Sequence, residues 1–512
     1  MFTPRSSGVL LHPTSFPSPY GIGDLGDEAY RFVDWLAEAG QRWWQILPLN
    51  PTWADGSPYK SPAALAGNPL LVSPDRLIKL GLLEEAEVST LRDSGGSRFA
   101  HIDFPAVMKL KQQLLLSAFE RSRRAGAPSE LKQRFDEFRH KETDWLEPLS
   151  MFLALREANG GRNWIEWTEL VDHQTKQPTG EAHSQLAERI EFHRFEQFLF
   201  DVQWNELRSY ARERNIRIIG DIPIYVSDDS ADVWGNQHIF LLDAEGRAEE
   251  MAGVPPDYFA ATGQLWKNPI YNWRVLEERG YDWWLRRIHR TLEQVDVARM
   301  DHFRGFEAYW SVPKGEETAI RGEWKEGPRE KLFHAIARSL GGDSKSLPLI
   351  AEDLGTITPP VVALRKEFGL PGMRVLQFEL MDPNEAAWHV EQYEADTAVY
   401  TGTHDNDTTL GWFKKEILPH GDRLNRVRSL VKGELDTIVW DMIDMAWRSS
   451  ADLAVAPLQD LFGLDSDARM NLPGTEWPQE PNWRWRYHPE HLTSDISHRL
   501  RELTDGHRRR VS

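Results

Sequence analysis

Cysteine is absent from this chain of 512 residues. Its absence excludes disulfide bonds and thiolate chemistry and is compatible with a reducing cytoplasm. The N-terminus also lacks the apolar segment of a signal peptide, and no apolar run approaches the roughly 18 residues that a membrane-spanning helix requires. These absences predict a cytoplasmic protein without a membrane partner.

Positive charge is scarce relative to negative charge. The chain contains 60 Lys and Arg against 79 Asp and Glu, a formal net charge of -19, which argues against a nucleic-acid or anionic-membrane partner. A Gly-rich phosphate loop with a lysine and an HExxH motif are also missing. His302 and His404 have no spacing typical of metal ligands, and Asp405-Asn406-Asp407 lacks the glycine and terminal glutamate of a calcium loop. We therefore expect a neutral substrate.

Eight short apolar segments alternate with helical periodicity or with long irregular stretches. We expect these segments to be strands at 8–11, 43–49, 216–226, 297–301, 347–352, 373–379, 398–404 and 453–460. The alternation predicts an α/β fold, a (β/α)8 TIM barrel with large inserted subdomains between its strands. Only a loop and a final helix are expected after the eighth strand. Residues 1–512 are thus predicted to form a single catalytic barrel without a C-terminal β-domain.

Two stretches are far longer than ordinary connections between a strand and a helix. Residues 51–190, after the second strand, show helical periodicity and are predicted to be a mostly helical insertion. Residues 228–280, after the third strand, form a second insertion. Within it, glycines flank an aromatic-rich loop at 253–269, which is typical of a lid over a ligand. An ordinary surface loop is the alternative.

Carboxyl side chains stand at the ends of three predicted strands, as Asp301, Glu352 and Asp405. Active sites of (β/α)8 barrels lie at the C-terminal ends of the strands, so we expect the three to share one site. Arg299 precedes Asp301 by two residues, which places both side chains on one face of the strand. There the guanidinium would keep the carboxylate ionised. A purely structural ion pair explains this pattern equally well.

Two carboxyl groups in a barrel mouth indicate cleavage of a glycosidic bond. Asp301 is the expected nucleophile. Glu352 is the expected general acid, because it follows an apolar run and burial raises the pKa of a carboxyl group. Asp405 would bind sugar hydroxyls. His404 would donate to a hydroxyl or, as a core histidine, bond to a backbone carbonyl. The 22 Trp, 22 Phe and 12 Tyr suit stacking on sugar rings, although a large core accounts for most of them.

Short motifs along nearly the whole chain resemble those of one enzyme family, the 4-α-glucanotransferases known as amylomaltases or disproportionating enzymes, of the α-amylase clan. The motifs are His12-Pro13-Thr14-Ser15, Pro19-Tyr20-Gly21-Ile22-Gly23, Ser57-Pro58-Tyr59, Gly220-Asp221-Ile222-Pro223, residues 253–269, Arg299-Met300-Asp301-His302-Phe303-Arg304-Gly305, Ala351-Glu352-Asp353-Leu354-Gly355, Thr403-His404-Asp405-Asn406 and Asn471-Leu472-Pro473-Gly474-Thr475. Each motif alone is weak to moderate evidence, whereas all of them in this order are highly specific.

The resemblance implies a retaining double displacement on α-1,4-glucans, with Asp301 as nucleophile, Glu352 as acid and base, and Asp405 stabilising the transition state. The two carboxyl groups would then lie about 5–5.5 Å apart. It implies no cofactor and no metal. The donor is an α-1,4-glucan and the acceptor is glucose or a maltooligosaccharide. The residues expected to contact substrate are Tyr59, Asp221, Asp257, Phe259, Trp266, Arg299, His302, His404 and Asn471.

Transfer and hydrolysis use the same three acids, so the residues alone do not separate them. A closing lid at 253–269 and aromatic acceptor sites favour a sugar over water as acceptor. The alternatives are an α-1,4-glucan hydrolase of the same clan and a non-catalytic glucan-binding protein. By resemblance, the pathway would be maltodextrin or glycogen metabolism. The sequence predicts nothing about protein partners.

Overall fold

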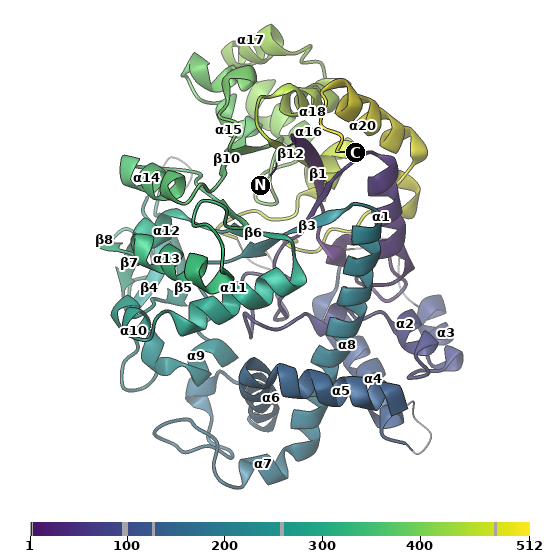
Figure 1. Cartoon of the computed structure of the whole chain (residues 1–512), viewed down its shortest axis with the longest axis vertical. Helices are drawn as coiled ribbons and strands as arrows, with labels where there is room; N and C mark the ends of the chain where they lie inside the picture. The colour runs from purple at the N-terminus through teal and green to yellow at the C-terminus, as the bar shows by residue number, and fades with distance from the viewer. Residues whose placement is uncertain are drawn as a thin grey trace.

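Eight parallel strands form a nearly closed barrel in the computed structural model, which describes residue 2 and residues 4–94, 101–124, 129–256, 261–475 and 479–511. The strand order around the barrel is β10-β11-β12-β1-β2-β3-β6-β9, and Figure 1 labels β10, β12, β1, β3 and β6. The strands are β1 (Ser6–Leu10), β2 (Trp43–Gln45), β3 (Arg217–Ile222), β6 (Val297–Met300), β9 (Leu349–Ala351), β10 (Gly372–Val375), β11 (Thr397–Tyr400) and β12 (Leu453–Pro457). Between β9 and β10, the N–H of Ala351 donates to the carbonyl oxygen of Pro371 at 2.9 Å. The predicted (β/α)8 barrel is confirmed.

Several barrel strands end earlier than predicted. Residues 376–379 form the short helix α15 (Leu376–Glu379) instead of continuing β10, and β11 ends at Tyr400 rather than at His404. Likewise, α19 (Leu458–Leu461) follows β12 directly. All four residues of α19 are buried, so burial continues beyond the strand end. Periodicity alone cannot distinguish a short buried strand from a buried helical turn.

Helices surround the barrel and fill the long connections between its strands (Figure 1). Those before β3 are α1 (Asp27–Glu38), α2 (Pro74–Lys79), α3 (Glu85–Ser94), α4 (Phe104–Ser122), α5 (Ser129–Lys141), α6 (Thr143–Ala158), α7 (Ala182–Gln185) and α8 (Ala187–Glu213). Those after β3 are α9 (Ala231–Gly235), α10 (Trp273–Glu278), α11 (Asp282–Gln294), α12 (Arg304–Glu307), α13 (Arg329–Leu340), α14 (Pro359–Glu367), α16 (Thr409–Trp412), α17 (Gly421–Leu430), α18 (Ile438–Arg448) and α20 (Ser494–Gly506). In the described part of the chain, no strand follows β12.

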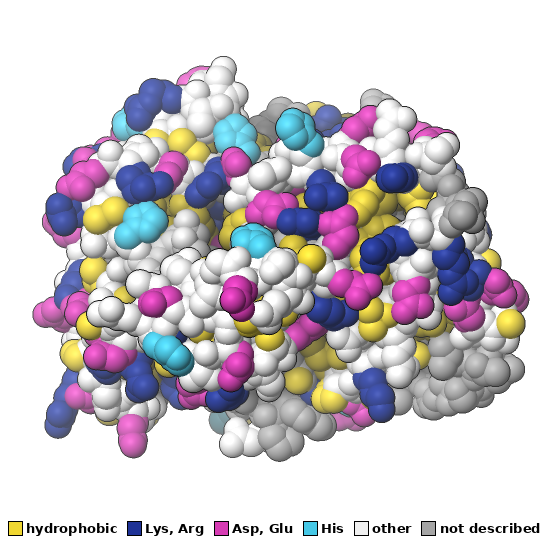
Figure 2. Space-filling model, turned by 90° about the horizontal axis from the view of Figure 1, so that it is seen from below, with side chains coloured by type: hydrophobic (Ala, Val, Ile, Leu, Met, Phe, Trp, Pro, Cys, Tyr) yellow, Lys and Arg dark blue, Asp and Glu magenta, His cyan; other side chains and the backbone are white. Residues whose placement is uncertain are grey.

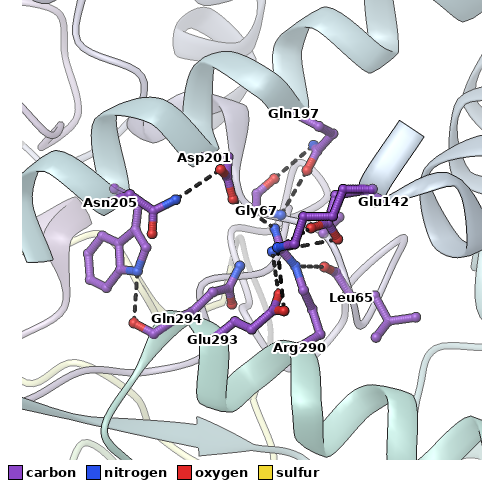
Figure 3. Close-up of polar contacts among 12 residues, drawn as sticks. Leu65, Gly67, Glu142, Gln197, Asp201, Asn205, Arg290, Glu293 and Gln294 are labelled. Atoms are coloured by element: carbon purple, nitrogen blue, oxygen red, sulfur yellow. Dashed lines mark hydrogen bonds and ion pairs between the residues drawn. The ribbon is translucent and has the colours of Figure 1, made fainter. Parts of the chain in front are cut away.

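Buried polar contacts attach the helical segment between β2 and β3 to the barrel helix α11 (Figure 3). Arg290 of α11 is buried, and its guanidinium lies 3.3 Å from Asp201 of α8, 3.2 Å from Glu293 and 3.8 Å from Glu142. The side-chain amide of Gln197 on α8 accepts from the N–H of Gly67 at 2.8 Å and donates to its carbonyl oxygen at 2.9 Å. These contacts hold α8 in one position against the barrel.

Replacing Arg290 with Met should destabilise the protein by about 3 kcal/mol, because the partly buried Asp201 would lose its cation and Glu142 would keep only Lys141. The midpoint of urea unfolding measures the loss. The matched control is Arg274→Met on α10, whose ion pair with Glu278 is solvent-exposed; it should change stability by less than about 0.5 kcal/mol. Equal midpoints for the two variants would show that Arg290 does not stabilise this contact.

A second, antiparallel sheet lies beside α12 and α13 (Figure 1), in the order β5-β4-β7-β8. Its strands are β4 (Glu250–Val254), β5 (Gln264–Pro269), β7 (Ala308–Pro313) and β8 (Glu323–Glu326). The prediction of a loop over 253–269 is therefore wrong at 253–254 and at 264–269, which belong to the two arms of the β4–β5 hairpin. Sequence periodicity misses this sheet because β4 pairs with β7, and the barrel strand β6 lies between these two strands in the chain. Asp257 and Phe259 lie outside the described residues.

Basic and acidic side chains are interspersed on the face of the molecule shown in Figure 2, with hydrophobic side chains between them. Within the described ranges, no helix is long and apolar enough to cross a membrane.

Candidate active site

Arg299 forms the centre of a carboxylate cluster inside the barrel. The parallel register pairs Asp221 of β3 with Arg299 of β6, which brings the two side chains together across neighbouring strands. Arg299 Nη1 donates to Asp221 Oδ2 at 2.6 Å, and Nη2 lies 2.8 Å from Asp301 Oδ1. Asp301 follows the last residue of β6, where its N–H donates to the carbonyl oxygen of Ile222 at 3.0 Å. The predicted pairing of Arg299 with Asp301 is confirmed, and Asp221 is a second partner of the same guanidinium.

Glu352 follows β9, the strand beside β6. Its Oε2 accepts from the N–H of His302 at 2.7 Å, and its Oε1 accepts from the N–H of Leu354 at 3.1 Å. Burial raises the pKa of Glu352 to about 8; Arg299 and the two N–H donors oppose this shift, and the charge of Asp301 adds to it. A protonated carboxyl group at neutral pH therefore lies near the arginine-paired carboxylate of Asp301.

Asp405 lies in the loop after β11 and is held from three sides. Asn471 Nδ2 donates to its Oδ1 at 2.6 Å, and His404 Nε2 lies 3.4 Å from its Oδ2. Arg469 donates to its backbone carbonyl oxygen at 2.5 Å. The carboxylate itself is only partly covered, with 44% of the side chain exposed. It is thus fixed in position while remaining accessible to a ligand.

Tyr59 connects the cluster around Arg299 with the loop that carries His404 and Asp405. Its hydroxyl group donates to Asp221 Oδ2 at 2.7 Å and lies 2.9 Å from His404 Nε2. The rings of Tyr59 and His404 are stacked at 5.3 Å. His404 therefore contacts a phenol and a carboxylate, rather than the backbone carbonyl that a core histidine would use. Burial lowers the pKa of His404, so its neutral form is favoured.

Trp266 on β5 brings the second sheet to the barrel mouth. Its ring meets that of His302 perpendicularly, with the centroids 5.0 Å apart. His302 is the residue after Asp301 and adopts φ 49°, a left-handed conformation that turns the chain sharply after the strand. Burial lowers the pKa of His302 to about 4, so its ring is neutral. The predicted contacts Asp257 and Phe259 cannot be placed, because they lie outside the described residues.

Sequence reasoning missed His12 and Trp483 as neighbours of this site. His12 follows β1, and its pKa is lowered to about 3 by burial and by the nearby His404. Its position after a predicted strand is a signal that could have found it. The Trp483 ring lies 5.6 Å from that of Tyr59 and 6.0 Å from that of His404. No local pattern marks Trp483, which reaches the site through a long loop after β12. Among the described side chains, no group of His, Asp and Glu could hold a metal ion.

The fold and the site define an enzyme class: a (β/α)8 barrel that acts on glycosidic bonds, with carboxyl groups of contrasting environment at the ends of adjacent strands. The family model described as 4-alpha-glucanotransferase matches residues 11–493. The chain therefore belongs to the 4-alpha-glucanotransferase family.

Two relatives in this family match over almost their whole length. The chain is 45% identical to a 4-alpha-glucanotransferase of Synechocystis, covering 100% of this chain and 99% of the relative. It is 44% identical to that of Thermus thermophilus, covering 99% of each chain. The amylomaltase from Streptococcus agalactiae, solved in complex with acarbose, superposes with a TM-score of 0.91 at 33% identity, over 99% of this chain and 100% of that one. These similarities extend to both insertions, not only to the barrel.

Proposed function

We propose that this chain transfers a segment of an α-1,4-glucan to the 4-hydroxyl group of glucose or a maltooligosaccharide, by a retaining double displacement. The observation that carries the proposal is the contrast between two neighbouring carboxyl groups. Asp301 is ion-paired with Arg299 and is 26% exposed, whereas Glu352 is buried with a raised pKa. The first suits a nucleophile and the second an acid that begins protonated.

In the first step, a carboxylate oxygen of Asp301 attacks the anomeric carbon of the donor. The bond from this carbon to the oxygen of the next sugar breaks, and Glu352 gives its proton to that leaving oxygen. A glycosyl ester on Asp301 results. In the second step, Glu352 takes the proton of the acceptor 4-hydroxyl, whose oxygen attacks the anomeric carbon and releases Asp301. Two inversions retain the α-configuration.

The remaining site residues position the sugar. Asp405, held by Asn471 and His404, would accept hydrogen bonds from hydroxyl groups of the distorted ring. Tyr59 and Asp221 would keep Arg299 oriented toward Asp301, and Trp266 would stack on a glucose unit beside His302. Asp257 and Phe259 remain proposed contacts from the same hairpin. Because Trp266 of this hairpin contacts His302 at the mouth, the hairpin would exclude water and favour a sugar acceptor.

Residues 1–512 would form one catalytic unit with insertions at 51–190 and 228–280. Elements α2 to α8 between β2 and β3 support this division, as do β4, β5, α9 and α10 between β3 and β6. A cytoplasmic location is proposed from the sequence composition alone.

Incubation with pure maltotriose tests the function. Glucose together with chains longer than maltotriose, at a constant number of reducing ends, is the result expected of transfer. A rise in reducing ends without longer products would identify a hydrolase instead. No reaction with maltotriose or with longer maltooligosaccharides would favour the non-catalytic glucan-binding protein.

A further inference from the structure

The second sheet presents an exposed tryptophan to solvent. Trp324 lies on β8, at the edge of the sheet, and is 39% exposed. In the described part of the chain, four large hydrophobic side chains are this exposed, and Ile320 at 53% is another of them, only four residues away. Exposed large hydrophobic side chains that are grouped on a surface are a feature of binding sites.

Neighbouring groups hold the Trp324 ring in place. Trp310 of β7 is its direct partner in the antiparallel register, and their rings meet at 66° with centroids 5.2 Å apart. Trp310 Nε1 in turn donates to the carbonyl oxygen of Ala319 at 2.8 Å. At Gly322 a Cβ would lie 2.2 Å from Trp310 Nε1, so only glycine lets the backbone pass this closely. The ring is thus preorganised rather than free to rotate, which lowers the entropic cost of binding.

The exposed tryptophan is connected to the loops of the active site. The guanidinium carbon of Arg304 lies 3.8 Å from the centroid of the Trp324 ring. Arg304 is three residues beyond Asp301, and its Nη1 donates to the carbonyl oxygen of Thr356, four residues beyond Glu352. On the other side, the N–H of Ala319 donates to the carbonyl oxygen of Thr262 in the β4–β5 hairpin, at 3.1 Å.

We propose that Trp324, Ile320, Arg304 and Glu326 form an outer platform that binds an α-glucan chain beyond the catalytic mouth. The exposed ring surface would stack on the apolar face of a glucose unit. Glu326 lies two residues from Trp324, on the same side of β8. Its side chain is 78% exposed and its Oε1 lies 3.3 Å from Arg329 Nη1, so the other carboxylate oxygen can accept hydrogen bonds from sugar hydroxyls. The platform would act on long donors or acceptors only. This inference rests on the proposed function, which supplies the glucan.

The test compares Trp324→Ala and Trp324→Phe with the wild-type enzyme, on maltotriose and on soluble amylose. Trp324→Ala should raise KM for amylose about three- to tenfold and leave kcat and the maltotriose kinetics unchanged. Trp324→Phe keeps an aromatic face, so its KM for amylose should lie between those of the wild type and Trp324→Ala. In electrophoresis through gels containing amylose, Trp324→Ala should be retarded less than the wild-type chain.

The matched control is Trp440→Ala. Trp440 on α18 also lies beneath an arginine, Arg499 of α20, at 4.1 Å, and its loss should leave both substrates unaffected. Amylose kinetics and retardation equal to wild type in Trp324→Ala would overturn the platform, as would equal losses on amylose and maltotriose. A wild-type enzyme that failed to convert maltotriose would instead refute the proposed function, so the two failures are distinguishable.

Discussion

Asp301→Asn should lower kcat for maltotriose disproportionation by about 10⁴-fold or more. The amide oxygen is a far weaker nucleophile than the carboxylate, so the glycosyl ester cannot form at a useful rate. Asparagine has nearly the same shape as aspartate, and Arg299 keeps its buried partner Asp221 at 2.6 Å. The fold should therefore persist, and glucan binding should be retained. Quenched-flow product analysis and calorimetric titration with maltoheptaose measure the two effects separately.

The result that contradicts this role is turnover in Asp301→Asn above about one-hundredth of wild type. Retained activity of that size would make Asp301 a structural partner of Arg299, the alternative that the sequence left open. Asp343→Asn provides a control, because Asp343 is an exposed acid in the loop after α13 and its replacement should leave both turnover and binding unchanged.

Glu352→Gln should lower kcat for maltotriose by about 10³-fold, since positioned proton transfer contributes about 10²–10⁴-fold. The glutamine amide oxygen can still accept from one of the two N–H groups, that of His302 or that of Leu354, so part of the loop's hydrogen bonding should survive. With α-maltosyl fluoride as donor, the rate of the first step should fall much less, because fluoride can leave without full protonation. The glycosyl ester on Asp301 should then accumulate and be visible by mass spectrometry of the intact protein.

The pH dependence gives an independent test of Glu352. A general acid must carry its proton, and the raised pKa keeps Glu352 protonated up to about pH 8. Wild-type kcat should therefore fall as the pH rises through that value. In Glu352→Gln this alkaline limb should disappear from the residual activity. An unchanged limb in the variant, or a wild-type limb near pH 4–5 as in free glutamate, would assign the acid to another group.

Two predictions made from local pattern are confirmed by the structure. The alternation of apolar runs with helical periodicity predicted a (β/α)8 barrel, because each strand must be buried on both faces and each helix on one. The spacing of two between Arg299 and Asp301 predicted a shared face, because side chains alternate along a strand. Both properties belong to short stretches of chain, and neither depends on how distant segments meet.

The sequence did not predict where several strands end, or that residues 250–269 join residues 308–326 in a second sheet. Hydrophobic pattern records burial, and burial continues past the strand ends through Leu376 and Gln377 of α15 and through all four residues of α19. Strand pairing between segments separated by β6 depends on a register that no local pattern encodes.

By itself, therefore, the sequence determined the barrel, the positions of Asp301 and Glu352 directly after its strands and the partner of Asp301. Only the tertiary structure decided how the site is assembled. It brings Tyr59 to Asp221 across 162 residues and to His404 across 345, places Asn471 and Trp483 against Asp405 and His404, and buries Glu352 enough to raise its pKa. Closure of the barrel makes these contacts, because it brings together strand ends that are distant in the chain. Burial in that shared mouth then raises the pKa of Glu352.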